Sequence, residues 1–211
     1  MKLTKAKREK LIEDLLKAYP DAKCALDYDS NYHLLVAVVL SAQTTDVSVN
    51  KVTPDLFRLA PTPEEMLKLG EEKLAEHIKS IGLYKNKAKN VIALSKELIE
   101  RFDSEVPRNF DDLTSLPGVG RKTANVVLAE LFGEQTIAVD THVFRLANRM
   151  GLAEADNVLA AEMQLQKAIP HDCWTKMHHA LIWHGRLVCQ AKKPDCQNCV
   201  INDSCKQNGL K

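Results

Sequence analysis

The sequence has no long hydrophobic run and no segment that would direct the chain out of the cell. Its longest uninterrupted apolar stretch covers only residues 34–40, whereas a helix needs about 20 apolar residues to cross a bilayer. The basic start, MKLTKAKREK, is not followed by an apolar segment, so it does not resemble a secretory signal. These absences argue against a membrane protein or a secreted one and predict a cytoplasmic protein.

The chain also lacks an excess of either charge. The net charge of its 211 residues is +1, so bulk charge does not indicate a nucleic-acid partner. The distribution is uneven, however, because residues 78–96 contain no acid and five lysines: Lys79, Lys85, Lys87, Lys89 and Lys96. Such a patch can follow phosphates even on a nearly neutral protein, although a charge run taken alone more often marks a solvated helix face.

Alternating strand patterns are absent, and almost every segment has helical periodicity. Residues 4–19 place Leu11 and Leu15 on one face, and residues 84–102 repeat apolar residues at the same spacing. Thr62-Pro63-Glu64-Glu65 forms a capping box with proline at the first helical position. Only residues 135–139 look extended, and they are too few to found a sheet. The sequence therefore predicts an all-α fold.

Several helix ends are predicted from capping residues. Gly133 and Gly151 stand where helices commonly stop. The residues expected at N-cap positions, each just before a periodic run, are Asn109, Asp140, Asp156 and Asp172. No low-complexity tract, long linker or internal repeat divides the chain.

The sequence contains six cysteines, and four of them gather near its end. Cys189, Cys196, Cys199 and Cys205 form the pattern C-x6-C-x2-C-x5-C. A disulfide framework is disfavoured in a reducing compartment, so the pattern predicts a metal or cluster site. All-cysteine zinc sites usually show two CxxC pairs, and the spacing matches neither common ferredoxin pattern for a [4Fe–4S] cluster. The spacing alone leaves zinc and cluster open.

Three histidines could also suggest metal binding. His179 and His184 are five residues apart and lie on different faces of a helix, and His178 is not part of a zinc-protease pattern. Beside Trp174 and Trp183, such histidines more often pack or form hydrogen bonds. They are therefore left out of the predicted metal site.

The most informative segment is LPGVGRKTA at residues 116–124. Pro117 ends the preceding helix, and Gly118 and Gly120 permit a tight turn. A periodic helix follows, so backbone N–H groups would point outward at its N-terminus, where they can hold a phosphate. The pattern could equally be a plain turn between packed helices. It is not a dinucleotide fingerprint, because no strand precedes it and the third glycine is missing.

Five motifs, in order along the chain, resemble those of one protein family. Residues 116–124 resemble a helix–hairpin–helix, and VDTHV at 139–143 resembles the aspartate-bearing segment that follows it. The four-cysteine loop has the family's spacing, and LSAQTTD at 40–46 and IGLY at 81–84 match upstream segments. Together the motifs cover most of the chain and are similar to the helix–hairpin–helix DNA glycosylases of base-excision repair, in particular the endonuclease III branch.

The resemblance implies a catalytic pair and a set of DNA contacts. Lys122 corresponds to the family's nucleophile and Asp140 to its catalytic partner, whereas spacing alone indicates a solvent-facing lysine and an N-cap. By similarity, Gln43 fills the gap left by an extruded nucleotide, and Ile81 and Leu83 enter the opposite strand. Ile81 and Leu83 could also be core residues at a turn. The expected DNA-binding residues are Gln43, Ile81, Leu83, Gly118, Val119, Gly120, Arg121 and His142.

The resemblance also favours a [4Fe–4S] cluster over zinc as the cofactor of the four cysteines. The cluster would be structural and would help to position DNA. Two helical domains are implied, with the active site between them. Their expected ranges are 24–134, a six-helix domain with the hairpin motif at 110–129, and 1–23 plus 135–211, with the cluster loop at 189–205.

The activity that the family implies is removal of oxidised pyrimidines, followed by strand cleavage 3′ to the abasic site through a lysine Schiff base. The expected partner is double-stranded DNA containing oxidised pyrimidines or abasic sites. The protein is expected to act as a monomer in the bacterial cytoplasm, associated with the nucleoid. A related adenine glycosylase fits less well, because it usually lacks the lysine. Two alternatives are a non-catalytic DNA-binding module with a zinc knuckle, and an electron-transfer protein, which leaves Lys122 and Asp140 unexplained.

Overall fold

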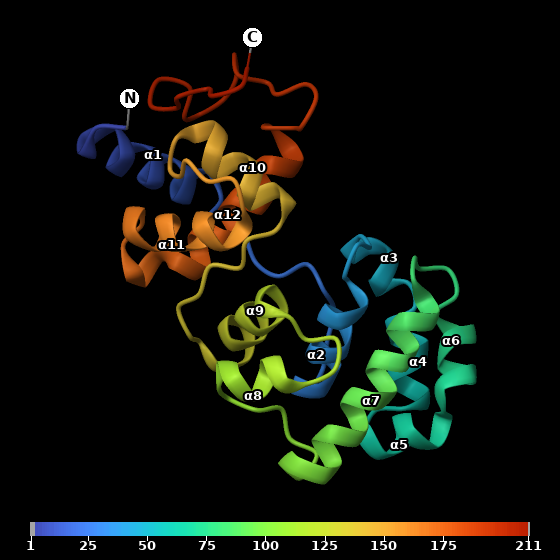
Figure 1. The fold of residues 1–211 in the computed structure, drawn as a ribbon. Coiled ribbons are helices and arrows are strands. Elements are labelled where there is room, and N and C mark those ends of the chain that lie inside the picture. Colours follow the sequence, from blue (N-terminus) through green and yellow to red (C-terminus); the bar gives the residue numbers. More distant parts are fainter. Residues whose placement is uncertain (1–2, 211) are drawn as a thin grey trace. The chain divides into compact units, whose positions relative to one another are not determined.

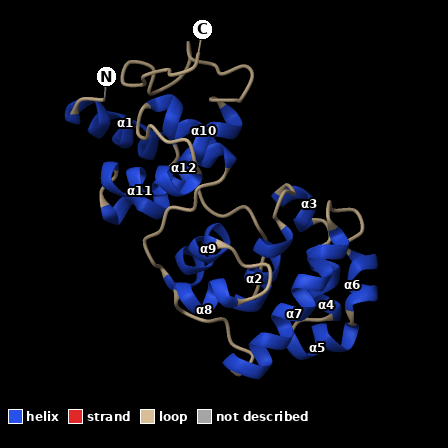
Figure 2. Cartoon of the chain, viewed as in Figure 1, coloured by secondary structure: helices blue, strands red, loops and turns tan. Residues whose placement is uncertain are grey.

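All regular structure in the described part of the chain is helical. The computed structural model describes residues 3–210, which contain twelve α-helices, one short 3-10 helix and no strand (Figure 2). The all-α prediction is therefore confirmed. Residues 135–139, which looked extended in the sequence, form a connection without regular structure. No helix in this range is long and apolar enough to span a bilayer.

The chain folds into two compact units. The first, called the hairpin unit, contains residues 25–133. The second, called the cysteine-loop unit, combines the chain up to Cys24 with the segment from Glu134 onward. Figure 1 shows how the chain runs from α1 into the hairpin unit and returns to α10, α11 and α12.

The hairpin unit contains more helices than the six expected from the sequence. The structure describes all of residues 25–133. The additional helices come from residues 46–77, which form four short helices. Proline in the first turns of α4 and α5, and Gly70 with φ 81°, interrupt the helical path. The eight helices are α2 (Asn31–Leu40), α3 (Asp46–Asn50), α4 (Thr53–Leu59), α5 (Pro63–Leu69), α6 (Glu71–His77), α7 (Tyr84–Phe102), α8 (Phe110–Ser115) and α9 (Arg121–Phe132).

Helix α2 is the centre of the hairpin unit. Its side chains are buried from Tyr32 to Leu40, which accounts for the apolar run at residues 34–40. It packs against α9 and α7, while α7 also covers α5 and α6, and α8 covers α9. Burying an aliphatic side chain of this size stabilises the fold by about 1.5–3 kcal/mol, so α2 anchors the helices that carry the hairpin.

A buried histidine lies at the edge of this core. The His33 ring stacks on Phe57 with centroids 4.0 Å apart, and its Nε2 lies 3.2 Å from the Pro61 carbonyl oxygen. Because that oxygen only accepts, Nε2 must carry the proton. Nδ1 is buried without a partner, so protonating it would create an unsatisfied buried donor. Burial lowers the pKa of His33, opposed by the Pro61 hydrogen bond and by Asp29.

The cysteine-loop unit is built around α12. Its elements are α1 (Lys5–Ala18), α10 (Thr141–Met150), α11 (Val158–Ala168), the 3-10 helix η1 (His171–Cys173) and α12 (Trp174–Leu187). Helix α12 packs against α1 and α10. Leu11 and Leu15 of α1 share one apolar cluster with Cys189 and Ile201 of the C-terminal loop, so this core holds the loop against the helices.

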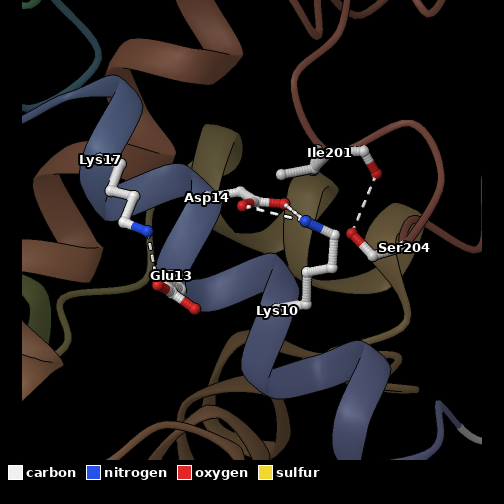
Figure 3. A network of polar contacts seen from close by, with 6 residues as sticks. All are labelled: Lys10, Glu13, Asp14, Lys17, Ile201 and Ser204. Atoms are coloured by element: carbon white, nitrogen blue, oxygen red, sulfur yellow. Dashed lines mark hydrogen bonds and ion pairs between the residues drawn. The ribbon is translucent and has the colours of Figure 1, made fainter.

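The outer face of α1 carries exposed ion pairs. Lys10 reaches Asp14 at 3.0 Å and Lys17 reaches Glu13 at 2.5 Å, and Figure 3 draws both pairs. In the same view, the Ser204 hydroxyl donates to the Ile201 carbonyl at 3.2 Å and closes a turn of the C-terminal loop. Ion pairs this exposed to solvent add little to stability, so the apolar face of α1 holds the helix in place.

The capping predictions are partly confirmed. Thr62, Asn109 and Asp140 are N-caps whose side chains accept a backbone N–H three residues on. Gly133 and Gly151 end their helices in the left-handed conformation.

Two N-cap predictions are wrong. Asn157, not Asp156, caps α11, because Asn157 has the extended backbone that lets its side chain accept from the Ala160 N–H at 2.9 Å. Asp172 lies inside η1, because Pro170 already starts a tighter turn before α12 begins.

Candidate functional site

The turn between α8 and α9 is held in one conformation by its own backbone. The Val119 N–H donates to the Leu116 carbonyl at 3.1 Å, and the Val119 side chain is buried. Gly118 has φ 78°, and a Cβ there would lie 3.0 Å from Cβ of Asn90 on α7. This position therefore needs glycine for both its backbone conformation and its close packing.

The N-terminus of α9 is accessible to solvent and carries positively charged side chains. Gly120 is its N-cap with φ −94°, supplies no side-chain cap, and has no atom within 4 Å of where a Cβ would stand. The first turn contains no acidic residue, and Arg121 and Lys122 are exposed. A helix N-terminus with basic side chains and no side-chain cap is suited to an anion such as a DNA phosphate.

Lys122 faces solvent from the first turn of α9. The helix buries its other face, which includes Ala124 and Val127, and this packing fixes where the lysine emerges. Its amine has no hydrogen-bond or ion-pair partner within the described part of the chain. The neighbouring Arg121 guanidinium lies 5.0 Å from the Phe110 ring centroid on α8, so it is held against the hairpin by a cation–π contact.

Asp140 caps α10 and keeps one oxygen uncommitted. Its Oδ1 accepts the Val143 N–H at 2.8 Å, and Oδ2 has no hydrogen bond with the described residues. The N-cap prediction for this half-buried residue is therefore confirmed. The cap also fixes the direction of the carboxylate, which a catalytic role would require.

His142 lies in the first turn after this cap and packs on α12. Its Nδ1 is 3.3 Å from Nη2 of Arg145, and a Cβ at Gly185 would stand 3.1 Å from the same nitrogen. The residue is half-buried.

The two upstream motifs form turns with left-handed residues. Gln43 has φ 53° and is exposed, and Leu83 has φ 58° and is 56% exposed. A left-handed backbone costs a residue with a Cβ about 1–2 kcal/mol, and such strain often marks functional turns. Ile81 is only 2% exposed, so the core alternative describes its side chain. Leu83 is the accessible member of the pair.

The four predicted ligands lie around a single pocket. Cys189, Cys196, Cys199 and Cys205 all line it, together with side chains of α10 and α12. All four thiols are free, as the argument against disulfides predicted. Within residues 3–210, no three histidine, cysteine, aspartate or glutamate side chains converge closely enough to hold a single metal ion.

N–H donors surround the pocket sulfurs. Arg149 Nη1 lies 3.4 Å from Sγ of Cys189 and also donates to the Gln190 carbonyl at 2.9 Å, while Nη2 donates to the Ala191 carbonyl at 3.2 Å. The Gln207 N–H donates to Sγ of Cys205 at 3.4 Å. Burial raises the pKa of the Cys205 thiol, and the neighbouring cysteines raise it further. Four soft sulfur donors, two of them with these N–H partners, fit a positively charged metal group that thiolates bind.

His184 also lines this pocket, although sequence spacing excluded it as a ligand. Its Nδ1 is 2.9 Å from the Tyr19 hydroxyl, and its Nε2 is 3.5 Å from Sγ of Cys199. Burial lowers the pKa of His184 to about 4 and raises the pKa of Tyr19, so the ring is neutral and the hydroxyl keeps its proton. Tyr19 therefore donates to Nδ1, and the remaining proton sits on Nε2, facing the sulfur.

One lysine of the basic segment at residues 78–96 is buried, which the sequence did not indicate. Lys87 is 4% exposed, and its amine donates to the Thr44 hydroxyl at 2.5 Å. Burial lowers the pKa of Lys87. The other four lysines are exposed, so most of the segment is a solvated basic face.

Comparisons with known proteins agree on one family. Residues 36–171 match the model described as HhH-GPD superfamily base excision DNA repair protein. The chain is 54% identical to Endonuclease III of Rickettsia conorii over 196 residues, which is 93% of each chain. It is 48% identical to Endonuclease III of Escherichia coli K12 over 204 residues, which is 97% of each.

Solved structures give the same result. A trapped Endonuclease III–DNA covalent intermediate in an estranged-adenine complex is 46% identical, with a TM-score of 0.93 and 97% of both chains covered. A thermostable thymine-DNA glycosylase is 25% identical, with a TM-score of 0.86 and 96% of both chains covered.

Proposed function

The chain belongs to the HhH-GPD superfamily of base excision DNA repair proteins, as a member of its endonuclease III family, and we propose that it removes oxidised pyrimidines from double-stranded DNA and cleaves the strand at the resulting abasic site. Membership makes the protein a DNA glycosylase with lyase activity. The observation that carries the proposal is an exposed lysine without a polar partner, Lys122, in the first turn of a helix that lacks a side-chain cap. The bacterial cytoplasm, where the chromosome lies, is its place of action.

Lys122 acts as the nucleophile of the glycosylase step. Its neutral amine forms a bond to C1′ of the damaged nucleotide while the C1′–N bond breaks, and the departing base keeps the bonding electrons and gains a proton. The amine then loses a proton, and the sugar ring opens at its C1′–O bond. The ring oxygen keeps the bonding electrons and takes up a proton to become a hydroxyl, which leaves a protonated imine between Nζ and C1′. A lysine suits this role because its primary amine can form the imine.

The same imine permits strand cleavage. It acidifies the proton on C2′, and removal of that proton forms the C2′–C3′ double bond. The C3′–O bond breaks at the same time, and the 3′ phosphate leaves with the bonding electrons. Water then hydrolyses the imine and releases Lys122 for another turnover.

Asp140 stabilises the positive charge that grows on the sugar as the base leaves. The cap contact of Oδ1 with the Val143 N–H fixes the carboxylate, and Oδ2 stays available. The position suits an anionic group, because the N-terminus of α10 carries partial positive charge. His142, a half-buried residue in the first turn of the same helix, contributes a DNA contact.

The hairpin and the two upstream turns bind DNA around the reacting nucleotide. The amides of Gly118 and Gly120 lie at or before the open start of α9, and Arg121 adds charge beside them. The Val119 N–H is used by the Leu116 carbonyl, so Val119 contributes by holding the turn in shape. We assign the stack-entering role to Gln43 and Leu83, which are exposed on tight turns. Ile81 supports its turn from the core, so its contribution to binding is to hold Leu83 outward.

The pocket in the cysteine-loop unit holds a [4Fe–4S] cluster on Cys189, Cys196, Cys199 and Cys205. When bound, the cluster joins four points of a loop that has little regular structure, and it supplies no bond-breaking step. The donor set supports this assignment, because Arg149 and His184 direct N–H groups at two of the sulfurs. Lys192 and Lys193 are exposed in this loop. The bound cluster would hold the loop so that these lysines contact phosphate.

The decisive experiment is borohydride trapping on a duplex that contains one thymine glycol. Wild-type protein should give a covalent protein–DNA band, because borohydride reduces the imine to a stable amine. Lys122→Arg keeps a long basic side chain but cannot form the imine, so it should bind the duplex and give no band. Lys73→Ala, which removes an exposed lysine on α6, should trap like the wild type.

A folded wild-type protein that binds this duplex without forming a band would refute the lysine mechanism. The next substrate would then be adenine opposite 8-oxoguanine, which tests for a glycosylase that works without a lysine.

A further inference from the structure

Lys87 is buried in surroundings that disfavour a positive charge. Its side chain is 4% exposed, its amine has the Thr44 hydroxyl as a hydrogen-bond partner, and no carboxylate in the described range lies within ion-pair distance. A buried cation without a counter-charge is unfavourable. The residue also lies in the first turn of α7, where the helix dipole disfavours a cation.

A neutral apolar side chain of similar shape would suit this position better for folding. Replacing buried charges with well-packed apolar groups is often neutral or stabilising. The amine therefore serves some purpose other than the stability of α7.

The contacts of Lys87 show what the amine joins. The side chain binds Thr44, which directly follows the left-handed Gln43. The backbone N–H of the same residue donates at 3.0 Å to the carbonyl of the left-handed Leu83. One residue thus connects two exposed, strained turns that are forty positions apart in the sequence.

Each turn is also stabilised by a local backbone hydrogen bond. The Thr44 N–H donates to the Ser41 carbonyl at 3.0 Å, and the Ile81 N–H donates to the Ile78 carbonyl at 3.0 Å. Neither of these local bonds connects one turn to the other. Figure 1 shows α3 and the start of α7 in the same part of the hairpin unit, and the Lys87–Thr44 hydrogen bond links the two turns beside them.

We propose that Lys87 is a positioning residue that locks the Gln43 turn and the Leu83 turn into one rigid element, so that both side chains enter the duplex together when the damaged nucleotide is extruded. The inference rests on the proposed function and deepens it. Lys87 does not contact the reacting sugar; it sets the spacing of the two side chains that replace the lost stacking and pairing. Its effect is therefore confined to extrusion, and the chemistry at C1′ proceeds without it.

The test compares two substrates that share their chemistry. One is a duplex with an abasic site opposite 2-aminopurine, whose fluorescence reports loss of stacking, and the other is the same abasic strand without its complement. Lys87→Met keeps the length of the side chain and removes the amine, and Thr44→Val removes the acceptor. Loss of a charged hydrogen bond changes rates by about tenfold or more, so both variants should cleave the duplex at least about tenfold more slowly in single turnovers.

Cleavage of the single strand should stay within about twofold of wild type, because no stack has to be opened. The 2-aminopurine signal should rise more slowly in both variants, and the double variant should be no slower than either single one, because the two side chains share one interaction. Thr44→Ser keeps the hydroxyl and should behave like the wild type, as should Lys68→Met on the exposed face of α5.

Urea unfolding separates this role from a structural one. Lys87→Met should be at least as stable as the wild type while cleaving the duplex more slowly. Equal losses on duplex and single strand, or a fluorescence change at the wild-type rate, would overturn the inference. Failure of the wild type to cleave either substrate would instead count against the proposed function.

Discussion

Replacing Gly118 with alanine tests whether the hairpin depends on one backbone conformation. The residue has φ 78°, and an added Cβ would lie 3.0 Å from Cβ of Asn90, closer than ordinary contacts allow. The atom that it meets is attached to the backbone of α7, so it cannot rotate away. Either the turn or the helix has to move.

The size of the effect follows from three contributions. A left-handed conformation costs alanine about 1–2 kcal/mol, and relieving the overpacked contact costs about 1 kcal/mol more. Alanine also restricts the unfolded chain, which offsets about 0.4–1 kcal/mol of this loss. The free energy of unfolding should therefore fall by about 2 kcal/mol. With a urea dependence of about 1–3 kcal/mol per molar, the midpoint falls by roughly 1 M.

Gly120→Ala provides the matched control, two residues along the same hairpin. Gly120 has φ −94° in an extended conformation and open space around its missing Cβ. Its free energy of unfolding should change by no more than about 0.5 kcal/mol. The added methyl group does lie at the proposed phosphate site, so Gly120→Ala should weaken binding to duplex DNA while the fold stays intact.

Unfolding should be followed by circular dichroism together with tryptophan fluorescence. Both tryptophans, Trp174 and Trp183, lie in the cysteine-loop unit, so their fluorescence serves as an internal reference for damage confined to the hairpin unit. Equal stability of Gly118→Ala and Gly120→Ala would refute the reasoning, because only the first substitution strains the backbone and meets another atom.

Three further results are expected. Asp140→Asn should keep the cap on the Val143 N–H and lose base removal, whereas Asp140→Ala should also lose about 1 kcal/mol of stability; equal stability of the two in thermal unfolding would contradict the cap. Cys199→Ser should lower iron content and visible absorbance, and Cys173→Ser, outside the pocket, should not; unchanged iron in both would exclude Cys199 as a ligand. The pKa of His33 is lowered in the folded state, so the unfolded chain takes up the proton first as the pH falls below about 6.5. Stability should therefore be full above that pH and decline below it, with a weaker decline in His33→Gln; the same slope in both proteins would show that other groups are responsible.

The helices were accessible from the sequence because their causes are local. Residues 84–102 have the periodicity of one amphipathic helix, and α7 has those bounds. Thr62, Asn109 and Asp140 were recognisable as N-caps, since a cap needs only a short polar side chain before a periodic run. The errors at Asp156 and Asp172 have the same origin. Adjacent residues competed for one cap, and local preference does not decide which of them adopts the extended backbone.

The free thiols of the four-cysteine loop were predicted from composition and spacing. The donors around these thiols were not predictable, because they come from distant positions. His184 faces Cys199 only because α12 packs against α1 and the loop folds back over them. In the sequence it is one of three histidines near two tryptophans, and nothing local distinguishes it from the other two.

The sequence by itself determined that the chain is helical, which family its motifs resemble and which residue types a lyase and a thiolate site would need. Only the tertiary structure decided which of several equivalent side chains is buried. Lys85, Lys87 and Lys89 alternate on the first turns of one helix, yet Lys87 alone turns inward to Thr44. Ile81 is buried and Leu83 exposed within one short turn. Periodicity shows that a helix has two faces, but burial depends on what packs against each face, and those partners come from parts of the chain that the local sequence does not identify.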